Sequence, residues 1–120
     1  VALLSNPGFP EISGIAVSTQ KYKGQQLAWV HNDGGHAKAL GLFSVVTGTL
    51  LHTFKFASSS SIVFQDPEDL TLGSCGSSFT LGGSGECIYL FDGGDNSARG
   101  AGGTSGRANY RFYKFREPVV

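Results

Sequence analysis

The chain has 120 residues, with nine Lys and Arg against nine Asp and Glu, so its formal net charge at pH 7 is zero. Zero net charge removes the electrostatic case for binding nucleic acid or an anionic membrane surface. Val, Ile, Leu and Phe together number 32 residues, which is enough for one small folded unit over residues 1–120. No segment approaches the roughly 18 consecutive apolar residues of a membrane-spanning helix, so we expect no membrane span.

Short apolar runs alternate with turn signals along the whole chain, and none keeps the periodicity of an amphipathic helix. The pattern therefore predicts an all-β fold. Connectors such as KYKGQQ and TGT are rich in residues that favour hairpin turns. Trp29 alternates with its neighbours in LAWVHND, and we expect its side chain to be buried. In chain order, strands are predicted at residues 14–18, 27–31, 39–46, 50–56, 69–74, 87–92 and 108–115.

The two cysteines enclose a stretch rich in Gly and Ser. Cys75 ends one predicted strand and Cys87 opens the next, so a tight turn-back would bring them together. This predicts a disulfide with a Cα separation near the typical ~5.5–6 Å, the alternative being two buried free thiols. A disulfide favours an oxidising compartment, and we therefore expect an extracellular or secreted protein. The chain lacks Met, so we expect a processed product from which any secretion signal has been removed.

Two segments of the chain share a layout. Residues 11–56 and 66–118 each begin with a carboxylate beside a short strand and continue to a second strand that ends in Asn, Asp or Gly. Their lengths are those of a four-stranded propeller blade. The sequence therefore predicts two antiparallel blade-like units.

Six short motifs occur in an order that is characteristic of a known family: EISGIA (residues 11–16), WVHNDGG (29–35), LFSVVTGTLL (42–51), DPEDL (66–70), YLFDGGDN followed by Arg99 (89–96), and YRFYKFREP (110–118). With these motifs the sequence resembles the amino-terminal portion of a family of secreted, bacterial-type six-bladed β-propellers. That family is similar in layout to the lactonase and phytase-esterase propellers. The resemblance implies antiparallel β-propeller-type blades, about two of them here.

The length of the chain departs from the resemblance. A six-bladed ring needs roughly three times as many residues, so a fragment, an assembly of copies and a two-blade sandwich all remain open. Two blades alone leave strand edges unpaired, and exposed edges recruit further strands. We therefore predict that the first and last strands pair with other protein chains or with copies of the protein itself.

Oxygen-bearing side chains gather at the predicted strand ends. Six acidic residues lie between Asp66 and Asp95 without any Lys or Arg among them, and Ca²⁺ is the natural partner of such hard oxygen ligands. The alternative is that these Asn-Asp-Gly segments only form turns, with side chains bonded to nearby backbone. The candidate metal ligands are Glu11, Asn32, Asp33, Glu68, Asp69, Asp92, Asp95 and Asn96.

The resemblance also implies a possible ligand set and a rival function. In the similar lactonase propellers a central divalent ion is held by Glu, Asn and Asp, which correspond loosely to Glu11, Asn32, Glu68 and Asn96 here. Our first interpretation is an extracellular β-propeller-type binding or structural module that is stabilised by a divalent cation and self-associates. The alternatives are a metal-dependent hydrolase of the lactonase or phosphoesterase kind and a subunit of an extracellular assembly. Fold analogy alone does not decide among them.

Overall fold

The computed structural model describes residues 3–33, 39–57, 62, 64–77, 85–95 and 109–120. These residues form seven strands and no helix, which confirms the all-β prediction. Accordingly, none of them belongs to a helix that would reach across a bilayer. The strands are β1 (Ile12–Tyr22), β2 (Gln25–Asn32), β3 (Ala39–Ser44), β4 (Leu50–Lys55), β5 (Pro67–Ser74), β6 (Glu86–Asp92) and β7 (Arg111–Arg116).

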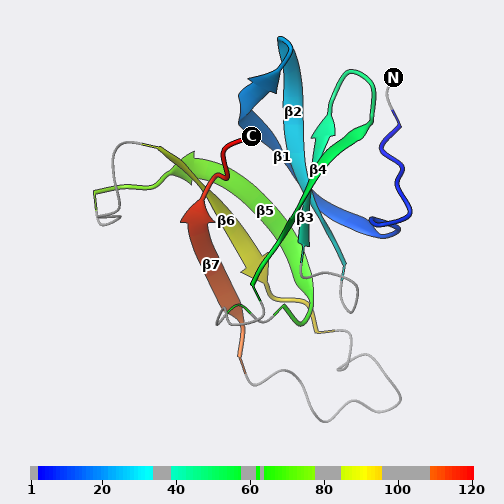
Figure 1. Cartoon of the computed structure of the whole chain (residues 1–120). Coiled ribbons are helices and arrows are strands. Elements are labelled where there is room, and N and C mark those ends of the chain that lie inside the picture. The colour runs from blue at the N-terminus through cyan, green and yellow to red at the C-terminus, as the bar shows by residue number, and fades with distance from the viewer. Residues whose placement is uncertain (1–2, 34–38, 58–61, 63, 78–84, 96–108) are drawn as a thin grey trace.

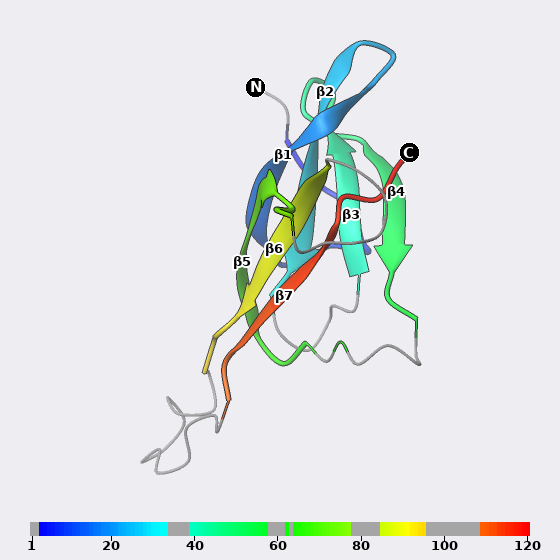
Figure 2. The same ribbon diagram turned by 90° about the vertical axis from the view of Figure 1, so that its left-hand side faces the viewer.

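The strands form two antiparallel meanders (Figure 1). Sheet A has the order β1-β2-β3-β4, and sheet B has the order β5-β6-β7. Each predicted blade segment therefore contains one sheet, although sheet B has three strands rather than four among the described residues. The sheets lie face to face, with β5, β6 and β7 in front of sheet A in Figure 2. Their first strands, β1 and β5, are neighbours where the sheets meet.

The turn between β1 and β2 shows how local sequence sets the pairing. Lys23 and Gly24 both have positive φ, at 48° and 79°, and Tyr22 pairs directly with Gln25. Two central residues with positive φ make the type I′ turn, whose twist matches that of the flanking strands. The hairpin register follows from this two-residue loop.

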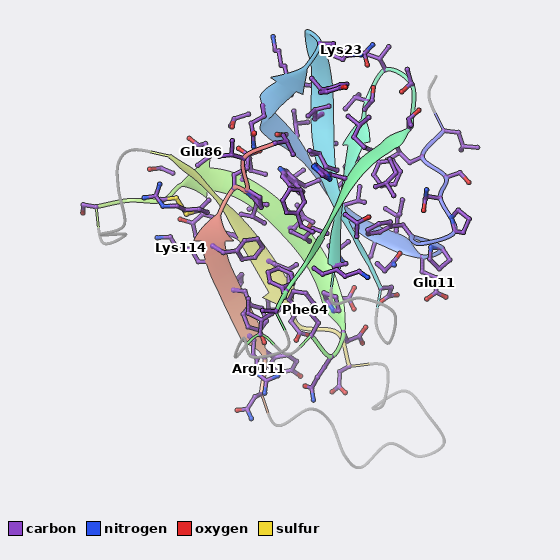
Figure 3. All side chains as sticks on the ribbon, in the orientation of Figure 1. Glu11, Lys23, Phe64, Glu86, Arg111 and Lys114 are labelled. Atoms are coloured by element: carbon purple, nitrogen blue, oxygen red, sulfur yellow. A yellow bond between two sulfur atoms is a disulfide. The ribbon has the colours of Figure 1, made fainter. Side chains whose placement is uncertain are left out.

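The main core lies between the two sheets. Its buried members come from both sheets: Leu27, Trp29, Leu40, Leu42, Leu70, Ile88 and Leu90. Trp29 is fully buried, which confirms the prediction, and its ring meets the Phe54 ring edge-on at 5.1 Å. Phe64 packs against the same core from the β4–β5 connection (Figure 3). Burial of these apolar side chains holds the two sheets together.

The N-terminal segment covers part of the other face of sheet A. Phe9 is buried with Val30 and Phe43 and meets the Phe43 ring edge-on at 5.8 Å. Gly41 makes this approach possible, because a Cβ there would lie 2.8 Å from the Phe9 ring. The cover stops short of β1, where Ile15 remains 55% exposed.

The C-terminal segment returns from β7 to sheet A. The Glu117 carboxylate accepts hydrogen bonds from the Ser18 and Thr19 hydroxyls, from the Thr19 backbone N–H at 3.2 Å and from Trp29 Nε1 at 2.8 Å. Gln20 Nε2 donates to the Pro118 carbonyl at 2.6 Å. These bonds tie the end of sheet B to β1 and β2.

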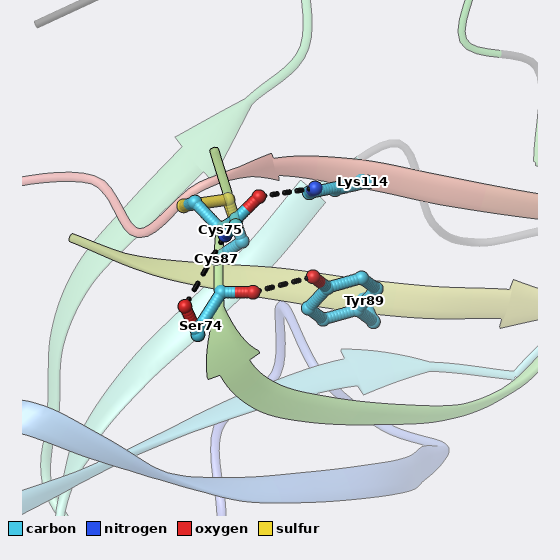
Figure 4. Close-up of a disulfide and its surroundings, with 6 residues drawn as sticks. Ser74, Cys75, Cys87, Tyr89 and Lys114 are labelled. Carbon is cyan, nitrogen blue, oxygen red and sulfur yellow. Dashed lines mark hydrogen bonds between the residues drawn. A yellow bond between two sulfur atoms is a disulfide. The ribbon is translucent and has the colours of Figure 1, made fainter. Parts of the chain in front are cut away.

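The predicted disulfide is present (Figure 4). Cys75 follows β5 and is bonded to Cys87 of β6, with Cα atoms 4.9 Å apart. The Cys75 N–H also donates to the Gly85 carbonyl at 3.1 Å, and Lys114 Nζ donates to the Cys75 carbonyl. The bridge therefore joins neighbouring strands of sheet B, and β7 is attached at the same point.

Candidate cation site

Three carboxylates meet at the junction of the two sheets. Asp33 follows β2, Asp66 immediately precedes β5, and Glu68 belongs to β5. One oxygen from each of them lies within 4.8 Å of the others. Asp66 is 6% exposed, Asp33 is half-buried and Glu68 is exposed. We call these three residues the acidic cluster, and it draws on both sheets.

The chain around Asp66 is held by a fully buried carboxylate. Asp92, the last residue of β6, accepts the N–H of Gln65 at 3.0 Å and the N–H of Asp66 at 2.8 Å. Hydrogen bonds from backbone N–H groups stabilise a charged carboxylate in a buried position. Asp92 therefore positions Asp66 instead of joining the acidic cluster.

Gly94 leaves room for the carboxylates of Asp66 and Glu68 to lie close together. A Cβ at this position would lie 2.3 Å from Glu68 Oε1 and 2.4 Å from Asp66 Oδ2. The Gly94 N–H donates to the Asp66 carbonyl at 2.9 Å, so the glycine backbone also contacts the cluster. Any other residue at 94 would push the two carboxylates away, because real Cβ contacts are never this short.

His31 lies beside the cluster on the inner face of β2. Its Nδ1 is 2.8 Å from the Asn32 carbonyl and must donate there, since a carbonyl only accepts. Nε2 is buried without a hydrogen-bond partner among the described residues, and Gly14 is small enough to lie against it. Burial lowers the pKa of His31 and so favours the neutral ring. The Asn32 hydrogen bond and the charges of Asp69, Asp33 and Glu68 act in the opposite direction but are outweighed.

Three other predicted ligands, Glu11, Asn32 and Asp69, make hydrogen bonds outside the acidic cluster. Asn32 ties down the N-terminal segment, because its side chain accepts the Glu11 N–H at 3.3 Å and donates to the Gly8 carbonyl at 3.0 Å. The Glu11 backbone carbonyl accepts the Asp33 N–H at 2.7 Å. Asp69 Oδ1 accepts the N–H of the next residue at 2.8 Å. Of these bonds, only that of Asp69 is to neighbouring backbone, as the alternative interpretation predicted, whereas those of Asn32 reach a distant segment of the chain.

Of the eight candidates, the structure brings Asp33 and Glu68 together in the acidic cluster. Asp95 is described and is not a member of the cluster, and Asn96 lies outside the described residues. Asp66 was not among the predicted ligands, although the charge run was counted from it. The sequence offered one signal for Asp66 as a ligand, which is that it lies two residues before the candidate Glu68, with Pro67 between them.

The cluster has the composition of a site for a hard cation. Three carboxylates this close repel one another unless a cation or hydrogen-bond donors offset their charge. Ca²⁺ takes six to eight oxygens, and carboxylates that bind in monodentate or bidentate fashion supply them. Backbone carbonyls and water complete such a shell in proteins.

Comparison of the chain with protein-family models, with curated proteins and with solved structures gives no match. The resemblance to six-bladed propellers therefore stays a prediction from sequence.

Proposed function

We propose that the protein is an extracellular β-propeller-type binding or structural module whose two sheets are joined by a bound Ca²⁺ ion. The observation that carries the proposal is the acidic cluster, in which Asp33 directly follows β2 of sheet A, while Asp66 and Glu68 lie at the start of β5 of sheet B. An ion held between them would replace mutual repulsion by attraction across the junction. Folding and cation binding would then be coupled.

The strand order supports the blade-like part of the proposal. Each sheet is an antiparallel meander in which consecutive strands are neighbours, and the first strands of the two meanders are adjacent. Propeller blades are meanders of this kind, arranged around an axis with functional groups at one end. The acidic cluster lies at one end of β2 and β5, which agrees with that arrangement.

The disulfide supports the extracellular part. Cys75 and Cys87 are both almost completely buried and bonded to each other. Disulfides persist in oxidising compartments and are rare in cytosolic proteins. Extracellular Ca²⁺ sites often have dissociation constants of about 10⁻⁴–10⁻³ M, which fits a cluster that is partly exposed.

The test is thermal unfolding and isothermal titration calorimetry with CaCl₂, with MgCl₂ as the ion control. We expect binding, and stabilisation by about 1–3 kcal/mol at Ca²⁺ concentrations 10 to 100 times the dissociation constant. Asp66→Asn should remove both effects. Asp69→Asn is the matched control, because Asp69 is a neighbouring acid of β5 outside the acidic cluster.

Two results would contradict the proposal. One is the absence of calorimetric binding in millimolar Ca²⁺. The other is equal loss of binding in Asp66→Asn and Asp69→Asn, which would indicate nonspecific attraction by the acidic end of the molecule.

A further inference from the structure

The two sheets can be superposed by their pairing registers. The second strands end at Asn32 and Asp92, which pair with Ile12 and Pro67. Counting back along the strands, Trp29 corresponds to Tyr89 and His31 to Phe91. In the third strands, Leu40 pairs with His31 and Phe112 pairs with Phe91, so Leu40 corresponds to Phe112. This correspondence between the two sheets follows from the observed Cα pairing of their strands alone.

This superposition relates an exposed face to a buried one. Trp29, His31 and Leu40 are fully buried on the face of sheet A that receives sheet B. Their counterparts Tyr89, Phe91 and Phe112 lie on the outer face of sheet B.

The outer face of sheet B carries aromatic side chains and a shallow hollow. Phe112 is 75% exposed, and its ring lies 4.7 Å from the Phe91 ring. A shallow hollow of about 80 Å³ is lined there by Asp69, Leu70, Thr71, Tyr89, Phe91 and Phe112. Lys114 borders the same face, with Nζ 5.6 Å from the centre of the Tyr89 ring (Figure 4). We call Tyr89, Phe91 and Phe112 the aromatic patch.

The complementary surface is also present in the molecule. Ile15 pairs with Val30 as Leu70 pairs with Leu90, and Val17 pairs with Ala28 as Leu72 pairs with Ile88. Leu70 and Leu72 pack sheet B onto sheet A. Their counterparts Ile15 and Val17 are 55% and 62% exposed on the outer side of β1. We call these two residues the β1 strip.

We propose that the aromatic patch of one molecule binds the β1 strip of a second copy, which repeats between molecules the contact that joins sheet B to sheet A within one. The contact is heterologous, so it leads to a ring or a filament, not to a two-fold dimer. It uses sheet faces, whereas the sequence predicted strand edges. At β1 the Thr19 N–H is already bonded to Glu117, so that edge is partly used within the chain. Neither surface includes the acidic cluster, and the proposal is independent of Ca²⁺.

The N-terminal segment limits the contact to β1. Phe9 covers Val30 and Phe43, so the second copy reaches only the strip that this cover leaves exposed. Such a surface is smaller than the ~800 Å² per partner of a standard interface, and we expect a weak association.

The test is sedimentation velocity at protein concentrations from about 10 µM to 1 mM, the range of weak interfaces. We expect the average mass of the wild-type protein to rise above 12.6 kDa with concentration. Val17→Asp and Phe112→Asp should each reduce this rise. Val46→Asp is the matched control, because Val46 is 63% exposed in the β3–β4 turn, outside both surfaces. Since all three side chains are exposed, circular dichroism should show unchanged folding.

A mixture distinguishes this geometry from others. Val17→Asp retains the aromatic patch and Phe112→Asp retains the β1 strip, so an equimolar mixture should form a 1:1 dimer and stop there. A wild-type protein that stays monomeric throughout the range would overturn the proposal. So would full self-association of Val17→Asp alone, which would mean that aromatic patches bind each other.

Discussion

Glu117 links the segment that follows β7 to strands β1 and β2. Burial raises the pKa of its carboxyl. The hydrogen bonds from Ser18, Thr19 and Trp29 together lower this pKa by more than burial raises it, so the pKa lies below its ordinary value. Trp29 is fully buried, so its indole N–H depends on this acceptor. A lowered carboxyl pKa in the folded state means that the charged form stabilises the fold.

The pH dependence of stability follows from this sign. The contribution of Glu117 is fully present above its ordinary unfolded pKa of 4.5 and is lost as the pH falls through its lower folded pKa. We expect Glu117→Gln to lower the free energy of unfolding by about 1–3 kcal/mol at pH 7. Urea unfolding between pH 3 and pH 7 should show this difference shrinking towards the acid end. A difference that stayed constant with pH would assign the effect of the substitution to packing and not to the charge.

Gly94 gives a second prediction at the scale of one residue. In Gly94→Ala the new Cβ would displace Asp66 and Glu68, so we expect the Ca²⁺-dependent shift in melting temperature to disappear. Gly73→Ala is the matched control, since its Cβ would meet the Tyr89 ring at an ordinary 3.5 Å. If the Gly94→Ala variant still bound Ca²⁺ with unchanged affinity, the ion would not lie between these carboxylates.

Among the elements, the β5–β6 pair depends most on a covalent constraint. Cys75 and Cys87 close a loop with a sequence separation of 12, and β7 attaches to this loop through Lys114. In the chain-entropy model a loop of this size stabilises the fold by roughly 3 kcal/mol.

We therefore expect the double variant Cys75→Ser/Cys87→Ser to lose about 2–4 kcal/mol of unfolding free energy in urea. Addition of reductant should not destabilise the variant further, whereas it should destabilise the wild-type protein. An equal effect of reductant on both proteins would show that the measured loss does not come from the bridge.

The elements themselves were largely predictable from the sequence. All seven predicted strands are present, because alternation of apolar residues and turn-forming dipeptides such as Lys23-Gly24 act over short distances. The last strand begins at Arg111, three residues later than predicted. The Cys75–Cys87 bridge was predictable for the same reason, since its two strands are neighbours along the chain.

The candidate site was less predictable, because its membership depends on contacts between sheets. Asp66 and Asp92 look alike in sequence, yet one belongs to the acidic cluster and the other is used by two backbone N–H groups. The β5–β6 pairing also has a register irregularity between Pro67 and Asp69, at the position of Glu68, which strand alternation in the sequence does not predict. A composition of Asp, Asn and Gly indicates a turn or a cation site equally well, and only the three-dimensional arrangement separates them.

At the scale of the whole molecule, two kinds of observed contact join the two sheets. The shared core around Trp29 and Leu90 lies between them, and the Glu117 bonds connect the end of sheet B to β1 and β2. The acidic cluster also lies at this junction, and in our proposal a bound cation there adds a third contact between the sheets. The proposed ion therefore acts on the junction and not on either sheet alone.

Amide hydrogen exchange with and without Ca²⁺ tests this claim most directly. We expect Ca²⁺ to slow exchange on both sides of the junction, at Asp33 after β2 and at Asp66 and Glu68 at the start of β5, with little change at the Lys23-Gly24 turn. Asp66→Asn should abolish the effect on both sides. Protection limited to one sheet, or unchanged exchange at calorimetrically saturating Ca²⁺, would contradict the account.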